Sequence, residues 1–144
     1  MKFFISYCDN GGLQFAADAA FILENNGHQA WYFDRDKTSG ILRIVDITEH
    51  IRNWCNKVLY ICTNRSIHSD GQSKEIGQWD NTNKQLIVIP IDVAVVPITI
   101  DPYIHNGMSG HRFKDEFNRF VTYDLERKME RWEELHRIIE VRST

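Results

Sequence analysis

The chain has 144 residues, the length of one domain with a single substantial core. Its hydrophobic fraction of 42% and its aromatic fraction of 12% favour a packed fold over disorder. The formal net charge is −3 and the basic side chains are scattered. This distribution argues against nucleic acid as a partner, because dense phosphate contact requires a basic patch.

Membrane and metal sites are not expected either. Every apolar run is far shorter than the roughly 20 residues of a membrane span. Cys8, Cys55 and Cys62 are odd in number and lack the spacing of metal ligands, and the histidines are scattered. We therefore expect reduced thiols, no metal site, no membrane contact and a cytoplasmic location.

The first strand and the first helix have clear boundaries. Residues 2–7 are an apolar run typical of a short buried strand, and Gly11-Gly12 break the pattern after it. Asp9 or Asn10 is expected to cap the helix that follows. That helix should end at Gly27, because glycine readily takes the left-handed conformation of a helix C-terminus.

The middle of the chain predicts two more strands and two more helices. Residues 28–33 predict a second strand, and residues 34–40 a polar loop of turn-forming residues. Between residues 44 and 54, apolar side chains recur three, four and three positions apart, which predicts one face of a helix. Residues 58–63 are a continuous apolar run, typical of a strand covered on both faces, and residues 72–80 predict a short helix.

The last third of the chain is less regular. A strand is predicted from Gln85, mainly before Pro90, because proline has no N–H to donate to a sheet. Residues 119–123 predict a fifth strand, at the edge of the sheet, and an apolar stripe predicts a C-terminal helix at about 124–140. We interpret residues 1–144 as one domain with a core at about 2–123.

Strands that alternate with helices predict an α/β fold, with a five-stranded parallel sheet and helices on both faces. The flavodoxin-like strand order 2-1-3-4-5 is the common arrangement of such units, and its ligands bind beyond the carboxyl ends of strands 1 and 3. This rule also brings the helix that carries Glu75 close to the expected pocket. The residues that it nominates at the strand ends are Ser6, Tyr7, Cys8, Thr63 and Asn64.

Glu75 is the carboxylate on which a catalytic interpretation depends. In a helix over residues 72–80, Trp79 lies four positions further on the same face, with Ile76 alongside, and these neighbours would partly exclude water from the carboxylate. Carboxylates perturbed in this way are candidates for functional sites. The alternative is an ordinary surface glutamate, solvated or paired with Lys74, next to a core tryptophan.

Four segments follow one another with a recognisable spacing: FISY at residues 4–7, LENNGHQAW at 23–31, the polar loop at 34–40 and SKE at 73–75. Together they resemble a TIR (Toll/interleukin-1 receptor) domain, over about residues 2–139, with the polar loop as its BB loop. Enzymatic TIR domains carry a catalytic glutamate on the helix after strand 3, which Glu75 matches. Many of them have tryptophan four residues earlier, where this chain has Gly71; here the tryptophan is Trp79.

The resemblance implies an NAD+ glycohydrolase or cyclase of a microbial immune or antiphage defence system, with NAD+ as substrate and no cofactor. Cleavage of the nicotinamide–ribose bond develops oxocarbenium-like charge on the ribose, which the Glu75 carboxylate would stabilise. The products would be nicotinamide and ADP-ribose or a cyclic ADP-ribose isomer. Candidate substrate-binding residues are Ser6, Tyr7, Phe33, Asp34, Arg43 and Trp79. Strand termination, core packing and solvated loop charge are the alternatives for these six.

Two other families with related folds are excluded by residues that this chain lacks. A receiver domain needs an aspartate at the end of strand 3, where this chain has Cys62-Thr63-Asn64, and a P-loop hydrolase needs G-x-x-x-x-G-K. A non-catalytic TIR adaptor stays open, with homotypic contact through the BB loop as its function and Glu75 as a bystander. We favour a combination in which homotypic assembly builds the NAD+ site, and we expect a separate sensor or effector protein as partner.

Overall fold

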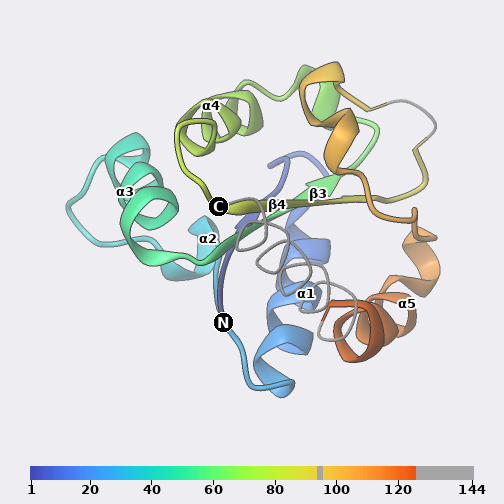
Figure 1. Ribbon diagram of the computed structural model, residues 1–144. Helices are drawn as coiled ribbons and strands as arrows, with labels where there is room; N and C mark the ends of the chain where they lie inside the picture. The colour runs from blue at the N-terminus through green and yellow to red at the C-terminus, as the bar shows by residue number, and fades with distance from the viewer. Residues whose placement is uncertain (94–95, 126–144) are drawn as a thin grey trace, which may run out of the picture.

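The computed structural model describes residues 1–93 and 96–125 of the chain (Figure 1). The predicted C-terminal helix at about 124–140 therefore lies almost wholly outside the described residues. Within the described residues, no helix is long and apolar enough to cross a membrane. The same residues contain no group of three or more His, Cys, Asp or Glu side chains that could hold a metal ion. Cys8, Cys55 and Cys62 are buried and form no disulfide.

Four parallel strands form the sheet over the described ranges, in the order β2-β1-β3-β4. They are β1 (Lys2–Ser6), β2 (Gln29–Trp31), β3 (Lys57–Cys62) and β4 (Gln85–Pro90). β3 is one of the two inner strands and all six of its residues are buried, as its continuous apolar sequence predicts. The predicted parallel sheet and the order of its first four strands are confirmed.

The predicted fifth strand at residues 119–123 is wrong. That segment is helical, divided between α5 (Phe113–Arg119) and the π-helical turn η5 (Phe120–Leu125). Phe113, Phe117, Phe120 and Val121 bury their side chains at helical spacing, and this packing outweighs the local strand preference of the Phe-Val-Thr-Tyr run. Beside β4, where a fifth strand would pair, there are two isolated bridges, Val88 with Ile104 and Ile91 with Met108.

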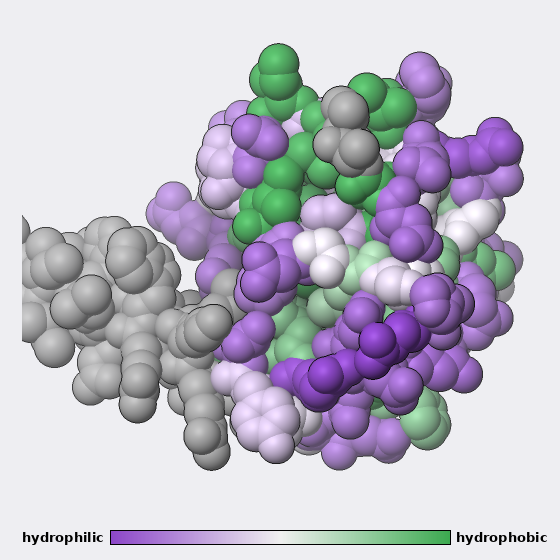
Figure 2. Space-filling model, turned by 90° about the vertical axis from the view of Figure 1, so that its right-hand side faces the viewer, coloured by the Kyte–Doolittle hydropathy of each residue, from purple (hydrophilic) through white to green (hydrophobic). Residues whose placement is uncertain are grey.

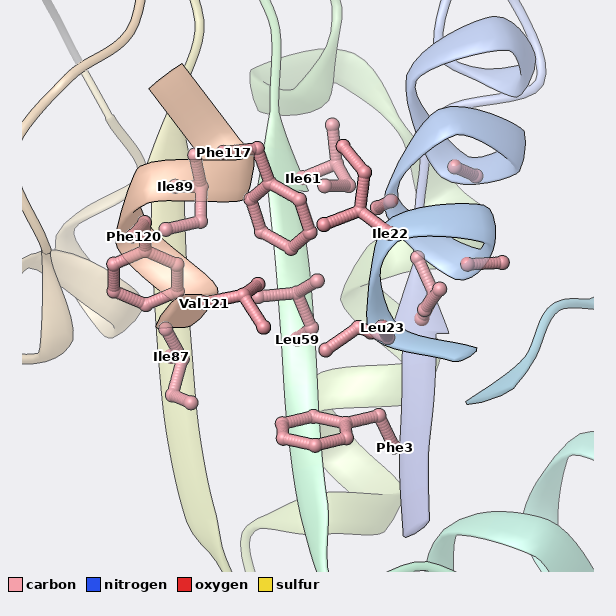
Figure 3. Packing of buried hydrophobic residues seen from close by; sticks show 14 of the residues in the cluster. Phe3, Ile22, Leu23, Leu59, Ile61, Ile87, Ile89, Phe117, Phe120 and Val121 are labelled. Atoms are coloured by element: carbon pink, nitrogen blue, oxygen red, sulfur yellow. The ribbon is translucent and has the colours of Figure 1, made fainter. Parts of the chain in front are cut away.

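Helices cover both faces of the sheet (Figure 1). α1 (Leu13–Asn25) and α5 pack on one face, where Phe117, Phe120 and Val121 meet Ile22 and Leu23 over the central strands (Figure 3). The other face is covered by α3 (Arg43–Glu49) with its π-helical continuation η1 (His50–Trp54), by α4 (Asp70–Trp79) and by the 3-10 helix η3 (Ile98–Tyr103). The described residues also contain two short 3-10 turns, η2 (Ser66–His68) and η4 (Gly110–Arg112). The core therefore lies in two layers, one on each side of the sheet.

On the side of the molecule that faces away from α3, polar and apolar side chains occupy different regions. Figure 2 shows that side, with hydrophilic side chains over its lower half and apolar side chains gathered toward its top. Ile98, the first residue of η3, is 89% exposed.

The boundaries of two early elements differ from the prediction. α1 is capped by Gly12, without a side-chain hydrogen bond, so the predicted cap at Asp9 or Asn10 is wrong. A Cβ on Gly12 would lie 2.5 Å from the carbonyl oxygen of Cys8, so only glycine fits this close approach of the backbone. The second strand ends at Trp31 because Phe33–Asp36 forms a helical turn, α2, in which the Asp36 carboxylate accepts a hydrogen bond from the backbone N–H of Tyr32.

Candidate functional site

Glu75 lies in the second turn of α4, and the start of that helix determines which way it points. Ser69 is the N-cap, and its hydroxyl oxygen accepts a hydrogen bond from the backbone N–H of Gln72 at 3.2 Å. The helix then begins at Asp70, so that Gly71, Lys74 and Glu75 fall on the side that borders a cavity.

This cavity has a volume of about 460 Å³ and lies between α4, the start of α3 and the loop after β1. It opens beside the carboxyl end of β1, next to the position that the ligand rule for open parallel sheets predicts. Its wall combines three apolar side chains, from α3 and the residue before it, with four charged side chains. The lining residues are Asp9, Leu42, Arg43, Ile44, Ile47, Gly71, Lys74 and Glu75.

The Glu75 carboxyl group is buried, with 6% of the residue exposed. Burial raises its pKa from 4.5 to about 8, while a hydrogen bond from Ser6 and the charge of Arg43 lower it and the charge of Asp9 raises it. Its Oε2 atom is buried and accepts no hydrogen bond from any described residue. An acceptor left unpaired at a cavity is free to bind a hydroxyl group of a ligand.

Ser6 and Gln72 lie behind Glu75, and both are fully buried. The Gln72 side-chain amide donates to the carbonyl oxygen of Ile61 at 3.0 Å and to the Ser6 hydroxyl at 3.4 Å. Ser6 therefore contacts Glu75 and the helix that carries it, and it has no surface on the cavity. Its position favours a role in orienting Glu75.

Arg43, predicted as a substrate-binding residue, does line the cavity. Its guanidinium lies over the ring of Phe33 at 4.4 Å and pairs with the Asp9 carboxylate at 3.1 Å. Phe33, another predicted residue, therefore borders the site only through Arg43.

Tyr7 and Asp34 contact each other and do not line this cavity. The Tyr7 hydroxyl donates to the Asp34 carboxylate, and the backbone N–H of Asp34 donates back to the Tyr7 oxygen at 3.1 Å. Burial, and then the bond to Asp34, raises the pKa of Tyr7 well above its usual range. This pair ties the end of β1 to α2.

Trp79 follows Glu75 by one turn of α4 and lines a different cavity. Its indole N–H donates to the carbonyl oxygen of Lys84 at 2.8 Å, and its ring packs edge-on against Tyr103. There it lines a separate cavity of about 400 Å³, together with Ile76 and η3. Trp79 is therefore not among the residues that line the Glu75 cavity.

A third cavity has a volume of about 500 Å³. Cys8 and Asn64, which the strand-end rule nominates, line it together with Asn10, Arg65 and His68. Of the predicted strand-end residues, Cys8 and Asn64 thus line this cavity, Ser6 contacts Glu75, and Tyr7 pairs with Asp34.

Loop 37–42 borders the cavity through Leu42 and is held in place by Asp46, which sequence reasoning missed. The buried Asp46 carboxylate accepts hydrogen bonds from the backbone N–H of Thr38 at 2.7 Å and from the Thr38 hydroxyl at 3.0 Å. His50 lies 3.3 Å from the same carboxylate. Loop 37–42 is therefore fixed to α3 at its first turn.

Other missed residues are Asp9, Gly71, Lys74 and Gln72. Ser69-x-x-Gln72 matches the pattern of a capping box. This motif predicts where the helix starts, and the start determines which face of the helix carries Gly71 and Lys74. No local signal identifies Asp9, because its partner Arg43 is 34 positions away in the chain.

No family model and no curated protein matches this chain, but several solved structures share its fold. The TIR domain of the Toll-related receptor TRR-2 from Hydra magnipapillata has a TM-score of 0.69 at 19% identity, over 85% of this chain and 95% of that one. The Clostridium botulinum CMP N-glycosidase BcmB has a TM-score of 0.59 at 14% identity, over 84% and 99%. A TIR-STING receptor from C. gigas, in complex with 2′,3′-cGAMP, has a TM-score of 0.59 at 17% identity, over 81% and 38%. The chain therefore has the fold of TIR domains.

Proposed function

We propose that this chain is an NAD+ glycohydrolase or cyclase that acts in immune or antiphage defence signalling. The observation that carries the proposal is the Glu75 carboxylate, buried and with a raised pKa, at the wall of a cavity that also holds Arg43 and Lys74. A structural carboxylate gains little from such a position, because burial penalises its charge. Carboxylates with strongly perturbed pKa values cluster at functional sites.

The reaction breaks the bond between C1′ of the ribose and the nicotinamide nitrogen. The bonding electron pair leaves with the nicotinamide, which becomes neutral, so no strong general acid is required. The ionised Glu75 stabilises the positive charge that develops on the ribose. Water then bonds to C1′ and loses a proton to give ADP-ribose, or an adenine nitrogen attacks C1′ to give a cyclic isomer. Arg43 and Lys74 would hold the pyrophosphate.

The chemistry is compatible with the fold, since one protein of the same fold is a CMP N-glycosidase. Nucleotides other than NAD+ are therefore part of the test. Purified native protein at high concentration is expected to consume NAD+. Glu75→Gln should lower kcat/KM by about 100-fold or more, because it removes the charge that stabilises the transition state.

The matched control is Glu49→Gln, which removes an exposed carboxylate from α3 outside the cavity. It should keep native activity. If Glu75→Gln is folded by circular dichroism and consumes NAD+ at the native rate, the assignment of Glu75 is wrong. If the native protein cleaves CMP and leaves NAD+ intact, the substrate is wrong and the reaction class stands.

A scaffold role through homotypic contact is the second candidate function. It is favoured by a group of exposed apolar side chains at the end of loop 37–42 and the start of α3, namely Ile41, Leu42, Ile44 and Val45. Because Leu42 and Ile44 also line the Glu75 cavity, contact between copies at this surface would alter the site. We propose that assembly and catalysis are coupled there, and that a separate sensor or effector protein controls the assembly.

A further inference from the structure

An ion pair stands at the edge of the Glu75 cavity. Asp9, in the loop after β1, and Arg43, the first residue of α3, both line the cavity. Arg43 Nη2 and Asp9 Oδ1 are 3.1 Å apart, and the guanidinium is stacked on Phe33. The Phe33 ring holds the guanidinium group in one plane, and Asp9 takes up part of the hydrogen-bonding edge of that group.

This ion pair is of a kind that a ligand can replace. The Arg43 and Asp9 side chains are 46% and 62% exposed, and exposed ion pairs contribute little to the stability of a fold. Guanidinium groups bind phosphate with two parallel hydrogen bonds, a stronger arrangement than a single contact with a carboxylate. A phosphate group that enters the cavity therefore competes with Asp9 for the same cation.

We propose that Asp9 is an internal competitor that holds Arg43 when the cavity is empty and releases it to the phosphate of a nucleotide. This inference rests on the proposed function and adds a determinant of specificity. Asp9 then sets how strongly the site prefers a phosphorylated N-riboside over the same riboside without phosphate. The carboxylate of Asp9 also repels the incoming phosphate directly, which adds to the effect.

The test compares nicotinamide mononucleotide with nicotinamide riboside, which share the scissile bond and differ by one phosphate. Asp9→Asn keeps the size of the side chain and removes its charge. We expect KM for the mononucleotide to fall about fivefold relative to KM for the riboside, which is the scale of an exposed ion pair. Asp9 also acts on Glu75, but that effect applies to both substrates and cancels in their ratio.

Two controls separate this mechanism from a general structural change. Asp115→Asn, on α5 and away from the cavity, should leave the substrate ratio unchanged. In an Arg43→Gln background, Asp9→Asn should change the ratio much less, because only the direct repulsion between Asp9 and the phosphate is then removed. An equal change for both substrates, or no change for either, overturns the inference.

A binding measurement keeps the inference independent of turnover. Calorimetric titration of Glu75→Gln and of Asp9→Asn/Glu75→Gln with both compounds should show the same selective gain for the mononucleotide. If the native protein turns over neither substrate, the proposed reaction fails and the titration alone decides the role of Asp9. If neither Glu75→Gln nor Asp9→Asn/Glu75→Gln binds the mononucleotide, the proposed role of Asp9 is wrong.

Discussion

Replacing Glu75 by glutamine is predicted to stabilise the fold by an amount that grows with pH. The pKa of Glu75 is about 8 in the folded chain, against 4.5 for an ordinary glutamate. Between these values the folded state keeps a proton that the unfolded state has released, so the stability of the native protein falls as pH rises. Glutamine is neutral at every pH and does not carry this cost.

The size of the effect follows from the two pKa values. Each pH unit between them is worth about 1.4 kcal/mol, so the full penalty, reached above the folded-state value, is about 5 kcal/mol. At pH 7 the penalty is about 3 kcal/mol, and below pH 4.5 it vanishes because both states are protonated. A penalty of this size is a large part of the about 5–15 kcal/mol that stabilises a typical domain.

Urea denaturation followed by tryptophan fluorescence at pH 5, 7 and 9 measures the effect. The difference in free energy of unfolding between Glu75→Gln and the native protein should rise by about 4 kcal/mol from pH 5 to pH 9. Glu49→Gln is the control, because it removes one negative charge from an exposed position and therefore shows the effect of charge loss without burial. A difference between Glu75→Gln and the native protein that stays constant from pH 5 to pH 9 would refute the account of a buried carboxylate.

Two further predictions concern activity and loop 37–42. Because catalysis requires ionised Glu75, kcat/KM should rise with pH and level off above about 8, and a profile that falls with pH would contradict this role. Asp46→Ala should destabilise the fold by about 1–3 kcal/mol, because it removes two hydrogen bonds from Thr38 to a buried carboxylate, and limited proteolysis should then cut within residues 37–42. An unchanged urea midpoint with native protease resistance would show that Asp46 does not hold the loop.

Much of the sheet could be predicted because its signals are local. The continuous apolar run of β3, the stop at Gly27 and the alternation of strands with helices are each readable within a few residues. Gly27 has φ +86° and its neighbour His28 donates to the carbonyl oxygen of Leu23, as the stop signal predicts. The segment at 119–123 misled prediction, because its local strand preference gave way to helical packing of Phe117, Phe120 and Val121.

The site could be predicted only in part, because its residues meet through contacts distant in sequence. Glu75 and Arg43 are each predicted as site residues, and they line the same cavity. Nothing in the local sequence shows that Asp9 pairs with Arg43. Trp79 follows Glu75 by four positions, yet the two side chains diverge enough to line different cavities. Tyr7 and Asp34 satisfy each other, which local sequence does not reveal.

The most direct test of the central claim is mass spectrometry of the nucleotides left after NAD+ is incubated with concentrated native protein and with Glu75→Gln. We expect nicotinamide together with ADP-ribose or a cyclic isomer from the native protein, and intact NAD+ from the variant. Intact NAD+ with the native protein, or the same products from the folded variant, would contradict this claim.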